Sequence, residues 1–374
     1  MTIAVHISFP GNNHDLTGNF NFQCFSILAA RYPDYQFIFL FDKPVPPGII
    51  TTANIKTVHV SPAIRNNLLQ HFWYNFKLPS FIKKYNAVIF AGNGPVCSLR
   101  TGINQCIVVN DTSFLDKNNR NTSGEARYLK KHFKKFVEKA TVVAATSSHV
   151  LNTIIHVCPK AIDKVRMIGR GLPAKTNLTD HMGIQKFKEA YTGGKEYFLA
   201  FITDTSIQNT TMLLKAFSAF KKMQLSNMKL LLLISSVQKE NIVKDFDNYK
   251  YRNDVIFVIA ENEEQVSQFI AAAYAAIYLP VINAVEDHAL LPLIYEVPVI
   301  TANNDFLKGI FCDAAVYSQP AEQHIAEKMM LLYKDENFRN GLVESARLLA
   351  KAYTWEKTAT NLWQSLTGSA TQTA

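Results

Sequence analysis

The sequence lacks the cysteine and histidine patterns that hold disulfides or metals. Its five cysteines are odd in number and scattered, with no C-x-x-C pair, and its ten histidines show no H-E-x-x-H spacing. These absences argue against a disulfide framework and against a structural zinc site. The thiols are expected to be free and buried, at Cys24, Cys97, Cys106, Cys158 and Cys312.

Long hydrophobic runs and a secretion signal are also missing. Phe269–Ile282 is the longest weakly polar run, and it falls short of the roughly 18 residues that a transmembrane helix needs. The opening stretch MTIAVHISFP enters a strand-like pattern without the basic region and apolar core of a signal peptide. We therefore expect a cytoplasmic protein.

The composition is that of a globular chain too long for one domain. The 374 residues are 48% hydrophobic and 18% charged, which favours two domains with sizeable cores. Apolar strand-like runs such as QFIFLF alternate with helix-like runs, as in a parallel sheet covered on both faces. The pattern restarts at YFLAFIT, after a polar stretch at 173–183 that we interpret as a linker. The prediction is α/β: two Rossmann-like, doubly wound parallel-sheet domains at 1–172 and 186–350, and a helix at 351–366 crossing back to the first domain.

Positive charge dominates, with a net charge of +9, and this favours anionic partners. The densest cluster is RYLKKHFKKFVEKA, in which apolar residues recur at helical spacing with lysines between them. One interpretation is an ordinary solvated amphipathic helix; the other is docking on a membrane surface through Arg127–Lys139, at the inner face of the membrane. No nucleic-acid motif accompanies the charge, so no nucleic-acid partner is expected.

Ligands of parallel α/β sheets bind at the carboxyl ends of the strands. The loops at those ends are residues 10–18, 91–95, 110–113, 203–211 and 283–288. The first loop lacks G-x-G-x-x-G and therefore the Rossmann dinucleotide fingerprint. Its Gly11 is either a close-approach position for a ligand or an ordinary turn glycine.

Several stretches together resemble the retaining family-4 glycosyltransferases, whose fold is GT-B. VVNDTSFL is similar to the family's HD-x-x-F stretch, with Asn110 in place of histidine and Asp111 retained. The stretch from ATVVAATSSHV to VRMIGRGLP resembles the end of the family's first domain, with Arg170 where asparagine is usual. YFLAFITDTSIQNTTMLLKAF and YTWEKTATNLW resemble segments that open and close the second domain. The resemblance implies two domains that face a cleft, a nucleotide-sugar donor, no metal and no other cofactor.

The sequence departs from the family at the donor positions. The family's glycine after the first strand of the second domain falls at Ile202, and its basic pair falls at Ile207 and Gln208. The two glutamates that hold the donor fall at Asn283 and Leu291. A third acidic position falls at Gly309. Neutral amides stabilise a diphosphate less well than cations do, so weak donor binding is expected.

Residues at the predicted loops are the candidates for the site. On the donor side these are Thr205, Gln208, Asn209, Asn283, Glu286 and Arg170, with Lys195 as a further cation. On the acceptor side they are Gly11, Asn12, Asn13, Asn93 and Asn110, with Asp111 as the catalytic candidate or, equally, a turn cap.

Two functions follow from this resemblance and its departures. The first is transfer of a sugar from a nucleotide sugar to a glycan, lipid-linked or other acceptor, with the anomeric configuration retained. The second is a catalytically degenerate homologue that binds or stabilises an active partner glycosyltransferase. A nucleic-acid binder would rest on charge alone.

Overall fold

The computed structural model divides the chain into two compact units. The first unit comprises residues 1–173 and 353–374, and the second comprises residues 174–352. The structure describes residues 1–9, 19–49, 51–116, 123–173, 175, 181–203, 207–234, 246, 248–281 and 287–370.

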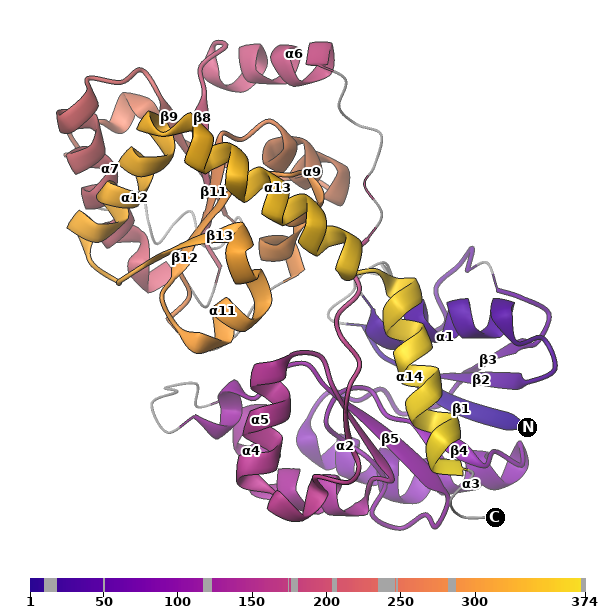
Figure 1. Ribbon diagram of the computed structural model, residues 1–374. Coiled ribbons are helices and arrows are strands. Elements are labelled where there is room, and N and C mark those ends of the chain that lie inside the picture. Colours follow the sequence, from indigo (N-terminus) through magenta and orange to yellow (C-terminus); the bar gives the residue numbers. More distant parts are fainter. Residues whose placement is uncertain are drawn as a thin grey trace. The chain divides into compact units, whose positions relative to one another are not determined.

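The first unit is built on a seven-stranded parallel sheet in the order β3-β2-β1-β4-β5-β6-β7 (Figure 1). Its central strands are continuous apolar runs, because helices cover both faces of the sheet. The register places Ile3 beside Phe37 on one side of β1 and beside Ile89 on the other. The strands are β1 (Thr2–Ile7), β2 (Gln36–Phe41), β3 (Ile55–His59), β4 (Ile89–Ala91), β5 (Asn104–Val109), β6 (Val142–Ala145) and β7 (Val165–Met167).

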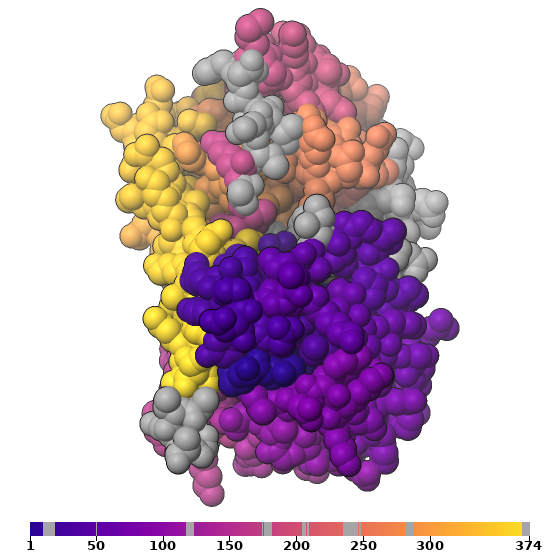
Figure 2. Space-filling view, turned by 90° about the vertical axis from the view of Figure 1, so that its right-hand side faces the viewer, coloured from indigo at the N-terminus to yellow at the C-terminus, as the bar shows by residue number. Residues whose placement is uncertain are grey.

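Two apolar cores cover this sheet, one on each face. The last helix of the chain belongs to one of them, because Leu362 and Trp363 pack with residues of the first helix. Trp363 stacks on Tyr32 with ring centroids 4.2 Å apart. Figure 2 shows this yellow helix against the indigo N-terminal residues. The helices are α1 (Phe20–Arg31), α2 (Asn67–Phe72), a π-helical turn η1 (Trp73–Lys77), α3 (Leu78–Lys84), η2 (Ser113–Leu115), α4 (Gly124–Lys139), α5 (Ser148–Val157), η3 (Pro159–Ala161) and α14 (Trp355–Ala370).

The second unit holds a six-stranded parallel sheet in the order β10-β9-β8-β11-β12-β13. Both sheets are parallel throughout, which confirms the predicted α/β fold class. The strands are β8 (Tyr197–Phe201), β9 (Lys229–Leu233), β10 (Val255–Val258), β11 (Ala275–Tyr278), β12 (Val299–Ala302) and β13 (Ala315–Ser318).

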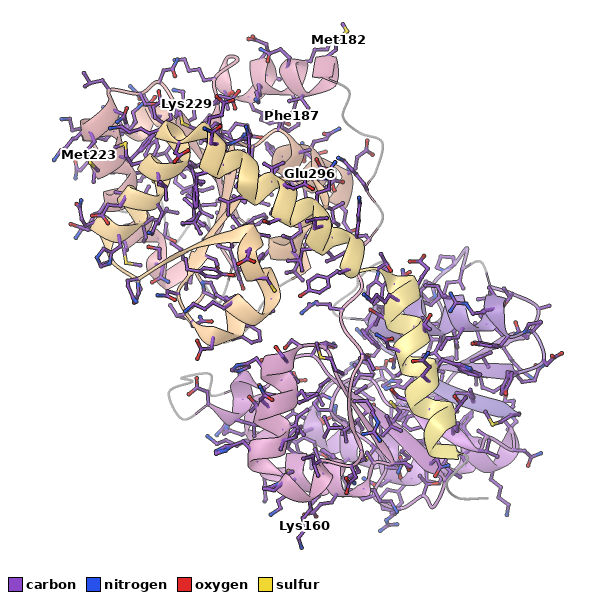
Figure 3. The ribbon with its side chains drawn as sticks, viewed as in Figure 1. Lys160, Met182, Phe187, Met223, Lys229 and Glu296 are labelled. Atoms are coloured by element: carbon purple, nitrogen blue, oxygen red, sulfur yellow. The ribbon has the colours of Figure 1, made fainter. Side chains whose placement is uncertain are left out.

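Helices surround this second sheet, and one of them corrects a prediction. Helix α6 begins at His181, inside the stretch 173–183 that we interpreted as linker. Its Phe187, labelled in Figure 3, packs edge-on against Phe269 of α9 at 4.9 Å. This apolar anchor was hidden by the polar residues around it. The helices are α6 (His181–Thr192), η4 (Ile207–Asn209), α7 (Thr210–Gln224), η5 (Arg252–Asp254), α9 (Glu263–Ala271), η6 (Asp287–Leu290), α10 (Leu291–Ile294), α11 (Asp305–Phe311), η7 (Cys312–Ala314), α12 (Glu322–Lys334) and α13 (Glu336–Ala352).

Helix α10 ends in a Schellman turn with a glutamate where glycine is the easy residue. Val297 N–H donates to Pro292 O and Glu296 N–H donates to Leu293 O, while Glu296 has a φ of 59°. A side chain in this left-handed region costs about 1–2 kcal/mol. Glu296 also pairs with Lys175 at 3.8 Å, but both groups are half-exposed, so this ion pair stabilises the folded state only slightly.

Replacing Glu296 with glycine is therefore expected to stabilise the second unit. The gain is about 0.5–1 kcal/mol in the free energy of unfolding, after the larger chain entropy of unfolded glycine is subtracted. Chemical denaturation measures it. Glu296→Ala is the matched control, because alanine removes the ion pair but keeps the strained backbone. Equal stability of the two variants would contradict this explanation.

Candidate functional site

A polar hollow of about 670 Å³ lies where three neighbouring strands of the first sheet end. Ser8 and Phe9 follow β1, Lys43 follows β2, and residues 93–96 follow β4. This is the edge at which parallel α/β sheets bind ligands. The rest of the lining comes from β1, from the segment at α2 and from the start of α4: His6, Ile64, Arg65, Asn66, Asn67, Gln70, Tyr74, Gly124, Glu125 and Leu129.

Four of the lining residues carry amide side chains: Asn66, Asn67, Gln70 and Asn93. Each amide offers both donors and acceptors, which suits the hydroxyl groups of a sugar. Gln70 is informative because its Oε1 is buried and has no hydrogen-bond partner among the described residues. A buried acceptor without a partner carries a desolvation cost that a ligand hydroxyl would remove.

Two cations and one acid also line the hollow. Lys43 Nζ donates to Phe9 O at 2.8 Å and lies 5.3 Å from the centre of the Phe9 ring, so its position is fixed. Arg65 and Glu125 are exposed at the rim. The hollow therefore offers positive charge beside neutral amides, a combination that fits a hydroxylated ligand with an anionic group.

A buried aromatic and ionic cluster forms the floor. The His6 ring stacks on Trp73 with centroids 4.4 Å apart, and its Nδ1 lies 2.8 Å from the Tyr74 hydroxyl. The hydroxyl accepts from Asn93 N–H at 3.3 Å, so its own proton is available to His6 Nδ1. This arrangement leaves His6 Nε2–H facing the fully buried carboxylate of Asp42, at 3.6 Å.

Two pKa shifts follow from this floor. Burial by itself would raise the pKa of Asp42, but His6, the Ile64 N–H and Ser8 outweigh it, so the pKa of this carboxyl lies below its ordinary value. The Ile64 N–H donates to Asp42 Oδ2 at 3.0 Å. Burial raises the pKa of the Tyr74 hydroxyl, so Tyr74 stays protonated at neutral pH.

The loop after β4 depends on glycine. A Cβ on Gly92 would lie 2.2 Å from Val96 O, because the chain turns back on itself there. Asn21 Nδ2 donates to both His6 O and Gly92 O, at 2.9 and 3.0 Å, and so joins the ends of β1 and β4. This bond network holds Asn93 at the hollow.

The structure places only some of the predicted acceptor residues at the hollow. Asn93 lines the hollow, whereas Asn110 is exposed after β5 and is not among the lining residues. Both Asp111 oxygens are engaged within its own turn, accepting from Ser113 N–H at 2.7 Å and from Ser113 Oγ at 2.6 Å. Gly11, Asn12 and Asn13 lie outside the described residues.

Sequence inspection missed most of the lining. Asn66, Gln70 and Tyr74 recur every four residues, which is a helical spacing of polar groups in the segment before WYNFK. That periodicity could have predicted these three lining residues. No sequence pattern marks Lys43 and Arg65, because only the folded loops bring them to the same hollow.

The donor candidates fall mostly outside the described part of the chain. Thr205, Asn283 and Glu286 lie there, as does the side chain of Gln208. Asn209 is described: its Nδ2 donates to Leu279 O at 2.7 Å, which joins η4 to the end of β11. Arg170 belongs to the first unit, after β7.

Leu291 opens α10 and is half-buried, and Ile202 is buried at the end of β8. The position aligned with the family's second glutamate is thus close enough to solvent to hold a polar side chain. Gly309 lies within α11 and Lys195 precedes β8.

Helix α4 is amphipathic as predicted. Phe133, Phe136 and Val137 are buried, while Lys130, Lys131, Lys134 and Lys135 are exposed. No helix in the described residues is both long enough and apolar enough to span a membrane.

A smaller hollow of about 440 Å³ lies beside the end of α4. Lys164 Nζ donates there to the carbonyl oxygens of Glu138 and Ala140, so it caps the helix. Lys160 points away from the unit at this end (Figure 3). Within the described ranges, no cluster of three or more His, Cys, Asp or Glu residues could hold a metal ion.

The two parallel-sheet units have the fold of the two-domain α/β class known as GT-B. Sucrose-phosphate synthase from Thermosynechococcus elongatus matches with a TM-score of 0.71 at 15% identity, over 100% of both chains. WaaG, a glycosyltransferase involved in lipopolysaccharide biosynthesis, matches with 0.70 at 12% identity, over 97% of this chain and 99% of WaaG. HepE of Anabaena, solved in complex with UDP and glucose, matches with 0.68 at 12% identity, over 98% and 99%.

Residues 184–349 match the family model of glycosyl transferases group 1. Residues 184–349 therefore form a glycosyl transferases group 1 domain, and the chain has the GT-B fold. This confirms the resemblance drawn from the sequence. No curated protein matches the chain.

Proposed function

We propose that the protein transfers a sugar from a nucleotide sugar to an acceptor held in the hollow of the first unit. The observation that carries this proposal is the amide-lined hollow at the strand ends, in a chain with a glycosyl transferases group 1 domain. HepE, which shares the fold, was solved with UDP-glucose, and this supports a nucleotide sugar as the donor class.

The acceptor in this proposal is a sugar or sugar-like alcohol with an anionic group. The buried Gln70 Oε1 accepts a hydroxyl proton, Asn93 and Asn66 orient further hydroxyls, and Lys43 and Arg65 face the negative charge. Glycans and lipid-linked sugar phosphates both meet this description.

The donor side of the proposal rests on Gln208, Asn209, Asn283 and Glu286, with Thr205 in the same loop as the first pair. The diphosphate gains negative charge as it leaves, and an enzyme stabilises that charge with positioned donors. Here neutral residues stand where the family has cations and carboxylates: the amides Gln208 and Asn283, and the apolar Ile207 and Leu291. We infer weak donor affinity and retention of the anomeric configuration, as the family relationship implies, without a metal or other cofactor.

Gln70→Leu tests the acceptor hollow. Leucine keeps the size of the side chain but removes the buried acceptor, so transfer should fall about tenfold in kcat/KM through the loss of one hydrogen bond. Release of the nucleoside diphosphate from UDP- and GDP-sugars, with sugar phosphates as acceptors, measures it. Gln323→Leu on the exposed face of α12 is the matched control. Equal losses in both variants would contradict the assignment of the hollow.

A second function is favoured by the departures at Ile207, Gln208, Asn283 and Leu291. Four missing charged contacts are a large loss for a diphosphate, because each is typically worth about 1.5–3 kcal/mol. In this alternative the protein binds a glycan or an active partner glycosyltransferase. Turnover by the isolated protein supports the first function, and activity only in the presence of a co-purifying transferase supports the second.

A further inference from the structure

The segment formed by α2 and η1 has two faces with opposite character. Asn66, Gln70 and Tyr74 line the hollow. Leu68, Phe72 and Phe76 are each two residues further along, so they point to the opposite side, since each residue turns a helix by about 100°. These three side chains, which we call the outer stripe, are 82%, 41% and 45% exposed.

The outer stripe is an ordered apolar surface rather than three scattered side chains. The rings of Phe72 and Phe76 stack with centroids 5.6 Å apart and planes 20° apart. Arg100 lies over the Phe76 ring at 4.0 Å, and Lys77 lies over Phe72 at 6.0 Å. The aromatic rings supply apolar surface and the neighbouring cations supply positive charge. Such a surface suits a partner that has both an apolar region and negative charge.

The charge around the stripe has one sign. Residues 43–110 contain no aspartate or glutamate but seven lysines and arginines. The first unit as a whole holds 21 basic and 9 acidic residues, a net charge of +12, whereas residues 174–352 hold 18 and 21, a net charge of −3. The basicity of the protein is therefore a property of the unit that carries the stripe.

Helix α4 brings further cations alongside α2. Asn67 Nδ2 donates to Gly124 O at 2.7 Å, which ties the starts of the two helices together. The two helices also pack against each other, so the lysines of α4 belong to the same part of the unit as α2. The exposed cations of that helix are Arg127, Lys130, Lys131, Lys134, Lys135 and Lys139.

We propose that the outer stripe and the cations of α4 bind the surface of an anionic phospholipid bilayer. Leu68, Phe72 and Phe76 would enter the headgroup region with their apolar side chains, and the lysines would remain at the lipid phosphates. A second copy of the chain fits poorly, because it would bring a second charge of +12 to the same face. A single-stranded nucleic acid fits less well, because Leu68 offers no ring on which a base can stack.

Bilayer binding at this surface would bring the hollow close to lipid-linked acceptors, an inference that rests on the proposed acceptor role of the hollow. The stripe and the hollow lie on opposite sides of one helical segment, whose diameter with side chains is about 10–12 Å. A lipid phosphate-linked acceptor could then reach Arg65 and Lys43 from the membrane surface. The binding itself does not depend on sugar transfer.

The test is co-sedimentation of the full chain with vesicles. Vesicles of phosphatidylcholine with phosphatidylglycerol are compared with phosphatidylcholine alone, for the wild type and for Phe72→Ser/Phe76→Ser. We expect binding to the anionic vesicles only, weakened by salt, and a loss of about tenfold in the double variant. Leu225→Ser is the matched control, because Leu225 is 93% exposed on the second unit. It should bind as the wild type does.

A second variant guards against misfolding of the double variant. Phe76→Trp keeps an aromatic side chain at the stripe, so it should bind at least as tightly, and the fluorescence of the new indole should shift to the blue when anionic vesicles are added. Failure of the wild type to bind anionic vesicles would overturn the proposal. So would unchanged binding by the double variant, which indicates adsorption through charge alone, or binding that RNA competes for and the stripe variants do not affect.

Discussion

Replacing Asp42 with alanine is expected to lower the free energy of unfolding of the first unit by about 3 kcal/mol, since one partner of a buried pair is removed. Asp42 is fully buried at the end of β2, facing His6 Nε2 at 3.6 Å and accepting from Ile64 N–H. Without it, the buried Ile64 N–H loses its acceptor, at a cost of about 1–3 kcal/mol, and His6 Nε2–H loses the negative charge that faces it. Asp34→Ala is the matched control, because Asp34 is exposed in the turn after α1.

The contribution of Asp42 to the free energy of unfolding is expected to fall at acid pH. Because the folded pKa of Asp42 is lowered, its contribution to stability is complete above the ordinary carboxyl pKa of about 3.9. The contribution is lost as the pH falls through the lower, folded pKa. The stability gap between wild type and Asp42→Asn should therefore be constant near neutrality and should shrink below about pH 4. A gap that widens in acid, or a loss of no more than about 0.5 kcal/mol for Asp42→Ala, the range of ordinary surface substitutions, would contradict the role of this carboxylate.

Much of the fold could be predicted from the sequence because buried parallel strands are continuous apolar runs. QFIFLF, YFLAFIT and KLLLLIS each contain a central strand. The edge strand β3, IKTVH, is not predicted from the sequence, because its outer side is half-exposed and its residues alternate in polarity. Helix α6 is hard to predict for a related reason: the two aromatic residues that anchor it on Phe269, Phe187 and Tyr191, stand among polar neighbours.

The site could be predicted only in part. Asn93 was found because it follows a recognisable strand, and strand ends are where such sheets bind ligands. Gln70, Arg65 and the floor around His6 lie in segments without a family motif, and they meet only after the sheet has formed. Asp42 sits between them at the end of a buried run, where its charge reads as an ordinary strand terminator.

The double substitution Gln208→Lys and Leu291→Glu is expected to tighten binding of nucleotide sugars by about a hundredfold. A lysine near the diphosphate replaces a neutral amide with a charge-assisted donor, and a glutamate near the ribose supplies two acceptor oxygens for its hydroxyls. Each such contact is worth about 1.5–3 kcal/mol, or roughly tenfold or more.

Position 291 lies close enough to solvent to accept a carboxylate. A carboxylate in the core would destabilise the domain, but Leu291 is half-buried at the start of α10 rather than part of the core. The neighbouring Leu290 and Leu293 are fully buried and hold the turn in place without it. Leu291→Glu is therefore expected to keep the melting temperature within a few degrees of the wild type, in line with about 0.5 kcal/mol for an ordinary surface change.

Isothermal titration with UDP, UDP-glucose and GDP-mannose measures the gain for the wild type, both single variants and the double variant. Leu291→Lys is the matched control, since it adds a charge of the wrong sign for ribose hydroxyl donors at the same position. If the lost contacts explain weak binding, the double variant gains most, each single variant gains about tenfold, and Leu291→Lys gains nothing through hydroxyl acceptance. Submicromolar binding by the wild type, tighter than about 8 kcal/mol, would show that Asn283, Glu286 and their neighbours already replace the charged contacts of the family.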